Sequence, residues 1–239
     1  MPLQQKPVVV VTGASKGIGI AATTVLLESF NTIVVSISRS RSPELLALIK
    51  KYPETLLTLE ADVTDERAVR EAVGLVVKIY QRIDALVLNA GVIQPFGRIE
   101  DSGTTTDSWR AHFDLNFFSL LYTVQAALPA LRASTCGGRI VFISSGAAVS
   151  GTPAMGVYNA SKAVMNSFCR TLAREEPEIV AIALRPGMVD TPMQKVIRTS
   201  GPTHLHEEDM QKFVQAHSTG KLIKPEDVGH VIAALSLNH

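Results

Sequence analysis

The 239-residue sequence has little cysteine, almost no net charge and no long apolar run. Its two cysteines, Cys136 and Cys169, are too few for a disulfide framework or for a zinc site. We therefore expect two reduced thiols in a cytoplasmic protein. The net charge of +1 gives no reason to expect a nucleic acid or an anionic membrane as a partner. Because no apolar run reaches about 18 residues, no membrane-spanning helix is expected.

Short runs of β-branched and aliphatic residues alternate with helical patterns along the chain. The run at residues 8–11 (VVVV) is apolar without alternation, which is typical of a strand buried on both faces of a parallel sheet. The predicted strands are residues 8–11, 32–37, 56–59, 84–88, 138–143 and 179–184. Together with the helices between them, they predict one α/β domain over residues 1–239, a doubly wound parallel sheet with helices on both faces. Its ligand crevice should lie at the carboxyl ends of the strands.

The first predicted strand runs into a glycine-rich turn at residues 13–19 (GASKGIG), which an apolar helical pattern follows. Glycines let the backbone approach a pyrophosphate closely, and the helix N-terminus offers unpaired N–H groups and the positive end of its dipole. Any tight strand-to-helix turn also favours glycine. The position of this turn directly after the first strand favours a dinucleotide site.

The end of the second predicted strand has no carboxylate, whereas NAD-binding folds place there an acidic residue that binds the ribose 2′-hydroxyl. Residues 37–41 read ISRSR instead. Arg39 could meet the 2′-phosphate of NADP, and Lys16 in the glycine turn could add a second positive charge. Singly, each would be an ordinary surface cation. Together, and with the acid missing, they favour NADP(H) over NAD(H).

Three polar residues further along the chain have two interpretations each. Tyr158 and Lys162 are four residues apart, so on a helix both side chains project from one face. A nearby ammonium would lower the pKa of the phenol from its usual ~10 and make it usable in proton transfer near neutral pH. The alternative is a ring packed on the core with a lysine beside it. Asn116 falls in a helix predicted over residues 108–133, where asparagine is unfavourable. It indicates either a solvated position or a local distortion that presents the asparagine to a buried water.

These motifs, in this order, resemble those of the classical branch of the short-chain dehydrogenase/reductase family over essentially the whole chain. The resemblance rests on TGxxxGxG at residues 12–19, DV at 62–63, NAG at 89–91 and PGxVxT at 186–191. It implies a Rossmann-type fold. The residues expected to bind NADP(H) include the two cations Lys16 and Arg39. The full set is Gly13, Ser15, Lys16, Gly17, Ile18, Gly19, Ser38, Arg39, Asp62, Val63, Asn89, Ala90, Gly91, Tyr158, Lys162, Pro186, Gly187, Val189 and Thr191.

The catalytic tetrad of the family falls on Asn116, Ser145, Tyr158 and Lys162. Ser145 is preferred to Ser144 because it precedes Tyr158 by thirteen positions, the common spacing in the family. The resemblance implies that Tyr158 protonates a carbonyl oxygen as the general acid and that Ser145 donates a second hydrogen bond. Lys162 would lower the pKa of Tyr158 and hold the nicotinamide ribose, and Asn116 would hold a water in a proton relay. No metal is needed.

The implied activity is hydride transfer from NADPH to a ketone, a diketone or an aldehyde of a small molecule. More narrowly, residues 114–119, 144–147 and 189–195 resemble fungal benzil-reductase-like and sepiapterin-reductase-like members. Three alternatives stay open. They are a 3-oxoacyl-carrier-protein reductase, a hydroxysteroid dehydrogenase, and a non-catalytic protein that binds or senses NADP(H).

The polar segment at about residues 191–220 is expected to cover the crevice as a substrate lid. The family commonly forms a homodimer or a homotetramer through the helices that carry Asn116 and Tyr158. Its members also usually continue past the last helix into a seventh strand at the sheet edge. This chain ends soon after a helix predicted over residues 225–237, which leaves open whether that last edge strand is missing.

Overall fold

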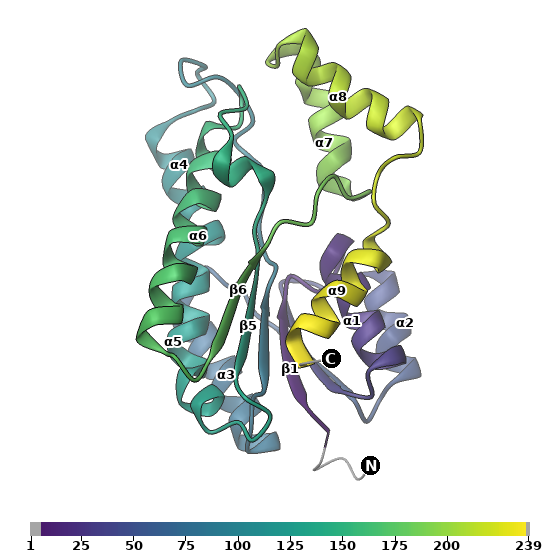
Figure 1. Cartoon of the computed structure of the whole chain (residues 1–239), viewed down its shortest axis with the longest axis vertical. Helices are drawn as coiled ribbons and strands as arrows, with labels where there is room; N and C mark the ends of the chain where they lie inside the picture. Colours follow the sequence, from purple (N-terminus) through teal and green to yellow (C-terminus); the bar gives the residue numbers. More distant parts are fainter. Residues whose placement is uncertain (1–5, 238–239) are drawn as a thin grey trace.

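The structure, a computed structural model, describes residues 6–237. Its centre is a sheet of parallel strands in the order β3-β2-β1-β4-β5-β6 (Figure 1). The strands are β1 (Val8–Thr12), β2 (Ile33–Ser38), β3 (Leu56–Glu60), β4 (Ala85–Leu88), β5 (Arg139–Ile143) and β6 (Val180–Leu184). The chain builds outwards from β1 to β3, returns to the middle at β4 and continues to the other edge. This order confirms the predicted doubly wound sheet, and every strand limit lies within one residue of the expected one.

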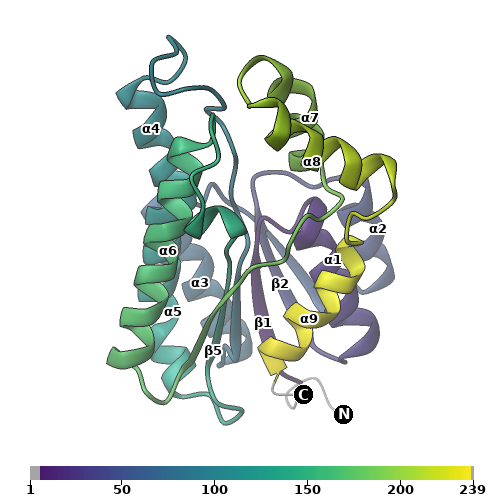
Figure 2. The same cartoon turned by 45° about the horizontal axis from the view of Figure 1, so that its top comes forward.

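Helices cover both faces of the sheet (Figures 1 and 2). One face carries α1 (Gly17–Ser29), α2 (Pro43–Lys51) and α9 (Pro225–Leu237), and the other carries α3 (Glu66–Tyr80), α5 (Ser119–Arg132) and α6 (Gly156–Glu175). Along β1, Val8 and Val10 lie in the core beneath α3, α5 and α6, whereas Val9 and Val11 lie in the core on the opposite face. Successive strand side chains point to opposite faces, so a strand covered on both sides needs an unbroken apolar run.

The helix predicted over residues 108–133 runs without a break from Thr106 to Arg132, and a wider π turn interrupts its α-helical hydrogen bonding. α4 (Thr106–Phe113) runs into the π-helical turn η2 (Asp114–Phe118), and α5 begins directly after it. Asn116 lies in this π turn with its side chain 0% exposed. The predicted distortion at Asn116 is therefore confirmed, and the solvated alternative is excluded. Single π turns within helices are often found at functional sites.

Between β6 and α9 the chain forms a helical segment at the carboxyl ends of the strands (Figure 2). It consists of α7 (Pro192–Ser200), the 3₁₀ turn η4 (Gly201–Thr203) and α8 (Glu207–Ser218). A parallel bridge between Val189 and Ile223 joins the two ends of this segment. Its buried residues Ile197 and Leu205 belong to the same apolar cluster as Tyr158. The segment therefore shares an apolar cluster with the predicted general acid.

Within residues 6–237, β6 is the edge of the sheet and α9 is the last element, packed against α1. The seventh strand considered from the sequence would lie beyond these residues. No helix in this range is both long and apolar enough to cross a membrane.

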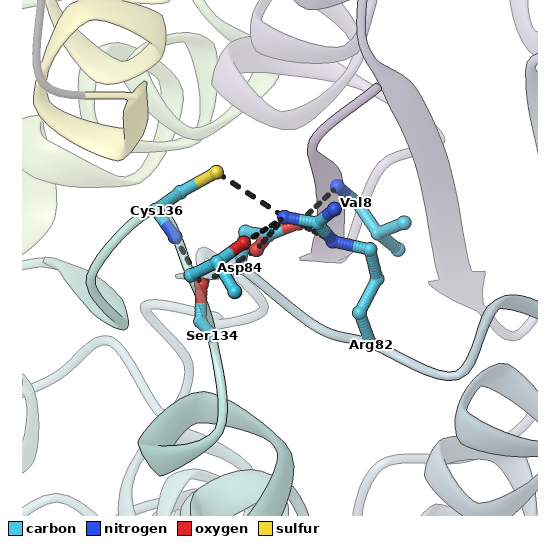
Figure 3. Close-up of polar contacts among 6 residues, drawn as sticks. Val8, Arg82, Asp84, Ser134 and Cys136 are labelled. Atoms are coloured by element: carbon cyan, nitrogen blue, oxygen red, sulfur yellow. Dashed lines mark hydrogen bonds and ion pairs between the residues drawn. The ribbon is translucent and has the colours of Figure 1, made fainter. Parts of the chain in front are cut away.

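At the amino ends of the strands, the carboxylate of Asp84 joins three segments of the chain (Figure 3). Its Oδ2 accepts hydrogen bonds from the Val8 amide and from Arg82 Nε, both at 2.8 Å. Its Oδ1 accepts from Arg82 Nη2 at 2.7 Å and from Ser134 Oγ at 2.6 Å. Arg82 Nη2 also lies 3.2 Å from Cys136 Sγ. This network holds β1, β4 and the loop before β5 together through the carboxylate of Asp84, which is only 1% exposed.

Replacing Asp84 by alanine is expected to lower the free energy of unfolding by about 3 kcal/mol, because the Arg82 guanidinium and the Val8 amide lose their acceptor. The ion pair between Arg67 and Glu71, with side chains 85% and 69% exposed, provides the control. Glu71→Ala should cost less than about 0.5 kcal/mol. Denaturant unfolding followed by circular dichroism measures both losses. Equal losses in the two variants would contradict the role assigned to Asp84.

Candidate active site

The carboxyl ends of β1 and β4 are fastened to each other through Asn89. Its Nδ2 donates to the carbonyl oxygens of Thr12 at 3.0 Å and Gly13 at 3.1 Å. In return, Thr12 Oγ1 accepts from the backbone N–H groups of Asn89 at 3.1 Å and Ala90 at 3.2 Å. The predicted cofactor residues Asn89 and Ala90 thus lie directly against the glycine turn, and the two strand ends form one continuous rim of the crevice.

The glycine turn brings the start of α1 unusually close to this rim. Gly13 has a φ of +67°, in the left-handed region that favours glycine, and a Cβ at Gly19 would lie 2.3 Å from the Gly13 oxygen. Within residues 6–237, α1 begins after Lys16 with no side-chain cap and no acidic residue in its first turn. Its first N–H groups therefore have no side-chain cap within these residues, and the positive end of its dipole lies at the glycine turn. This arrangement suits a pyrophosphate.

The charges near the end of β2 suit a 2′-phosphate. Arg39 and Lys16 are exposed, and neither forms an ion pair within the described part of the chain. Arg41, by contrast, is paired with Glu60, with Nε and Oε1 2.7 Å apart. Ser38 is buried at the end of the strand, where an NAD site would have a carboxylate. The residues present therefore fit NADP(H), because Arg39 and Lys16 form no ion pair in the described part of the chain and the carboxylate of Glu60, beside Ser38, is paired with Arg41.

The other predicted cofactor residues lie at the ends of β3, β4 and β6. Asp62 Oδ1 accepts from the amide of Thr64 at 3.0 Å and from its hydroxyl at 2.8 Å, which orders the turn after β3. After β6, Gly187 has a φ of +79°. The Thr191 methyl lies 3.4 Å from the position that a Cβ of Gly17 would take. The turn that follows β6 therefore contacts the glycine turn. The same turns contain Ser15, Ile18, Val63, Gly91, Pro186 and Val189.

Tyr158 lies in the first turn of α6, 8% exposed, and its phenol lies near the Ser145 hydroxyl, which acts on its pKa. Ser145 directly follows the turn after β5, and its Oγ accepts from the Ala147 amide at 3.1 Å. The neighbouring Ser144 has a different partner, because its hydroxyl donates to Asn166 Oδ1 at 2.6 Å. The structure therefore brings the preferred serine to the phenol and engages the other one elsewhere.

Lys162 lies one turn further along α6 and is buried. Its Nζ donates to the Ile143 carbonyl oxygen at 2.7 Å and lies 5.6 Å from the centroid of the Tyr158 ring. Burial lowers the pKa of Lys162 to about 8, because the charged form loses its contact with water.

Burial also raises the pKa of Tyr158, and the nearby Ser145 hydroxyl opposes this rise only in part. The lowering of this pKa by Lys162 is not seen in this structure and stays a prediction. Desolvation disfavours the charged phenolate, and it outweighs the effects that favour that form. Tyr158 is accordingly a neutral phenol at pH 7, ready to donate its proton.

The amide of Asn116 is paired with the backbone of Val92. Its Oδ1 accepts from the Val92 amide at 2.9 Å, and its Nδ2 donates to the Val92 carbonyl oxygen at 2.8 Å. Nδ2 also lies 2.9 Å from Nε2 of His112. Sequence reasoning missed His112. The available signal was its spacing of four residues from Asn116, which places both on one side of a helix.

Tyr158 belongs to an apolar cluster, which we call the apolar wall. Residues of the loop after β4, of the turn before α6 and of the segment from α7 to α8 form it: Ile93, Phe96, Ala147, Ala154, Met155, Met193, Val196, Ile197, Leu205, Met210 and Phe213. On the outside, Asp101 Oδ2 lies 3.1 Å from Nδ1 of His204, so a polar contact links the loop to the helical segment. An apolar wall beside a proton donor favours a substrate with hydrophobic groups flanking one polar reacting group.

Comparison with known proteins agrees with this geometry. The family model of the short chain dehydrogenases matches residues 7–201, most of the chain. The chain belongs to the short-chain dehydrogenase family. An uncharacterized oxidoreductase of Schizosaccharomyces pombe is 38% identical over 233 residues, covering 97% of this chain and 91% of that protein. The benzil reductase ((S)-benzoin forming) of Saccharomyces cerevisiae is 35% identical over 237 residues, covering 96% of this chain and 90% of the relative.

Solved structures of short-chain dehydrogenases show the same fold. A short chain dehydrogenase/reductase of Saccharomyces cerevisiae is 35% identical and superimposes with a TM-score of 0.90, covering 97% of this chain and 90% of that one. The structure of ElxO with NADP bound is 30% identical, with a TM-score of 0.81 over 97% of this chain and 92% of the other. The protein is therefore an oxidoreductase of the kind that acts on CH–OH or C=O groups with a nicotinamide cofactor.

The buried lysine of this short-chain dehydrogenase should reduce its stability at neutral pH. The folded pKa of Lys162, about 8, lies below the ordinary 10.5, so between these values the unfolded chain binds more protons there. Stability consequently rises with pH in this range, and the penalty is complete below pH 8 and disappears towards pH 10.5. Lys162→Met should raise the free energy of unfolding at pH 7 by about 1–2 kcal/mol, after allowing for the lost bond to Ile143.

The gain in the free energy of unfolding from Lys162→Met should vanish near pH 10.5, the ordinary lysine pKa. At that pH, Lys162 of the wild type is not fully charged in either the folded or the unfolded protein. Thermal unfolding of both proteins across this pH range measures the difference. A methionine variant that is less stable than the wild type at pH 7 would contradict the assigned desolvation.

Proposed function

We propose that this short-chain dehydrogenase is an NADPH-dependent carbonyl reductase that transfers a hydride to a ketone, a diketone or an aldehyde. The observation that carries the proposal is the buried phenol of Tyr158, which is protonated at neutral pH and lies near the Ser145 hydroxyl. It lies in a crevice whose rim carries the glycine turn. A neutral donor suits the reductive direction, in which the carbonyl oxygen gains a proton.

The preference for NADP(H) over NAD(H) rests on charge. Arg39 and Lys16 would meet the 2′-phosphate, the start of α1 would bind the pyrophosphate through its N–H groups, and Asp62 with Val63 would contact the adenine. The turn from Pro186 to Thr191 would hold the carboxamide. The NADP bound to ElxO supports this choice of cofactor.

The bound NADPH supplies the hydride. Tyr158 donates its phenolic proton to the carbonyl oxygen as negative charge develops there, and Ser145 orients that oxygen with a second hydrogen bond. Lys162, held by the Ile143 carbonyl, binds the nicotinamide ribose and passes a proton back to the phenol. Both amide hydrogens of Asn116 point to chain partners. The water that joins Asn116 to the relay must therefore donate to an oxygen of this residue.

A vicinal diketone with apolar substituents is the substrate that we expect to be reduced best. The apolar wall beside Tyr158 suits such groups, and benzil, the substrate named for the Saccharomyces cerevisiae relative, is a diketone of this class. The segment at about residues 191–220 would act as the lid, closed on one side by the contact between Asp101 and His204. We expect the protein to work in the cytoplasm as a homodimer or homotetramer.

The test of this function is NADPH oxidation, followed by its near-ultraviolet absorbance, with aromatic and aliphatic vicinal diketones, simple ketones and aldehydes. We expect turnover with several of them and the highest kcat/KM with an aromatic diketone. Tight binding of NADPH with no turnover of any carbonyl would contradict the reductase and support a protein that only binds or senses the cofactor.

The two adjacent serines provide a further prediction. Ser145→Ala should lower kcat by about a hundredfold, because it removes one of the two donors to the developing oxyanion. Ser144→Ala removes the hydrogen bond to Asn166 instead, so it should lower stability and change kcat less than about threefold. Steady-state kinetics and thermal unfolding of both variants measure this. Equal kinetic losses would contradict the choice of Ser145.

A further inference from the structure

The proposed reaction gives no part to His112, although its imidazole is only 2% exposed and lies beside the tetrad. Nδ1 lies 2.6 Å from the Gln94 carbonyl oxygen. Nε2 lies 2.9 Å from Asn116 Nδ2 and 3.0 Å from Ser161 Oγ. The edge of the ring meets the Tyr158 ring, with centroids 6.2 Å apart and an interplanar angle of 85°. One side chain thus touches the loop after β4, the π turn and the first turn of α6.

The partners of His112 determine where its proton lies. A carbonyl oxygen can only accept, so Nδ1 must carry a hydrogen to bond Gln94. The two bonds with Val92 fix the Asn116 amide so that its nitrogen faces the imidazole. Nε2 therefore accepts from Asn116, which requires a neutral ring. Among the contacts of Nε2 within the described residues, only the Ser161 hydroxyl, which donates to the Tyr158 carbonyl oxygen, could instead accept a proton from it. A proton on Nε2 would point at the N–H group of Asn116, and rotating the amide would break both bonds to Val92.

The contacts of His112 extend through Ser161 to Tyr158 and Lys162, two residues that the proposed reaction uses. The Ser161 hydroxyl lies 2.9 Å from the Tyr158 carbonyl oxygen, so it is held between the imidazole and the backbone of the turn that carries Tyr158. Ser161 is also adjacent to Lys162 in the sequence. A shift of the imidazole would therefore move the π turn and the Tyr158 turn relative to each other.

We propose that His112 is a positioning residue whose neutral imidazole holds the π turn of Asn116 and the first turn of α6 in register, and whose protonation at acid pH slows carbonyl reduction. The proposal rests on the reductase function for its kinetic readout. It assigns His112 no contact with substrate or cofactor.

The surroundings keep the imidazole neutral at pH 7. Burial lowers the pKa of His112, the positive Lys162 acts in the same direction, and only the bond to Gln94 opposes them. The titratable groups that face the ring, Lys162 and the neutral Tyr158, both belong to α6. The loop at residues 92–97 (VIQPFG) contains none. Protonation should therefore begin below the ordinary histidine pKa of ~6.5.

Three substitutions separate positioning from folding. His112→Gln places an oxygen acceptor near the position of Nε2 and keeps the bond from Asn116. His112→Asn can donate to Gln94 but does not reach Asn116, and His112→Phe keeps the volume of the ring without either bond. We expect kcat to fall about tenfold in the Asn and Phe variants, because the buried N–H group of Asn116 loses its acceptor in both. In the Gln variant, which keeps that acceptor, kcat should fall less than about threefold. The Kd for NADPH should change less than about twofold in all three.

The pH profile gives a readout that a merely structural residue would not affect. The kcat of the wild type should fall at acid pH, and this fall should disappear in His112→Gln, which has no titrating group at the position. Unchanged kcat in the folded Phe and Asn variants, or an unchanged acid limb in the Gln variant, would overturn the proposal.

A measurement without turnover separates this proposal from the proposed function. In the imidazole nitrogen NMR spectrum, the signals of His112 are those that disappear in the His112→Gln variant. At a pH where exposed histidines are protonated, these signals should be those of a neutral ring with its hydrogen on Nδ1. If the protein reduces no carbonyl but shows this tautomer, the reductase function fails and the link through His112 stands. A hydrogen on Nε2, or titration like a free histidine, overturns the link whatever the activity.

Discussion

Tyr158→Phe is expected to lower kcat for carbonyl reduction by about a thousandfold, within the range found for loss of a general acid. The change removes one hydroxyl group from a buried ring and leaves the packing of the ring in place. The carbonyl oxygen would then receive its proton only from water or through Ser145. Because the glycine turn and Arg39 are untouched, the Kd for NADPH should change no more than about twofold. Single-turnover kinetics with fluorescence titration of NADPH measure both quantities.

Tyr80→Phe is the matched control for this variant. Tyr80 is partly buried, and burial raises the pKa of its phenol as well, but it ends α3 near Val8 and Arg82, at the amino ends of the strands and away from the carboxyl ends where Tyr158 lies. Its substitution should leave kcat within about twofold. A Tyr158→Phe variant that keeps more than about a tenth of the wild-type kcat would show that the proton comes from another group.

Arg39→Ala is expected to raise the KM for NADPH by about 10- to 100-fold and to leave the KM for NADH almost unchanged. Charge-assisted hydrogen bonds to a phosphate each contribute about 1.5–3 kcal/mol, and only NADPH has the 2′-phosphate. The ratio of kcat/KM values for the two cofactors should therefore fall by the same factor. Lys16→Ala should act in the same direction with a smaller effect, because a lysine cannot bind a phosphate bidentately.

Arg41→Ala is the control for charge alone. Arg41 is two residues from Arg39 and equally positive, but it is already paired with Glu60. Its loss should change the KM for NADPH less than about threefold. If Arg41→Ala weakens NADPH binding as much as Arg39→Ala, selectivity comes from the general positive potential of this edge and not from one contact.

The sequence was sufficient to predict the sheet because its signals are local and repeated. The valines of β1 need both faces covered, and each strand is separated from the next by a helical pattern, so few other arrangements can bury them. The glycine turn was equally readable. Gly19 is needed where a Cβ would touch the Gly13 oxygen, and that contact follows from the strand-turn-helix path itself.

The electrostatics of the site could not be predicted in the same way. The spacing of Tyr158 and Lys162 suggested a lowered phenol pKa, but spacing says nothing about how much water reaches the pair. Burial depends on the turn before α6 and on the segment after β6, which are distant in the sequence. His112 shows the same difficulty, because its partners Gln94 and Ser161 lie 18 and 49 positions away.

The central claim is that this protein delivers a hydride from NADPH to a carbonyl carbon. The most direct measurement uses NADPH carrying deuterium at the transferable position of the nicotinamide, an aromatic vicinal diketone and mass spectrometry of the product. The account predicts one deuterium on the new carbinol carbon, formed faster with NADPH than with NADH. A protein that binds NADPH tightly but yields no deuterated product with any carbonyl tested would contradict the account.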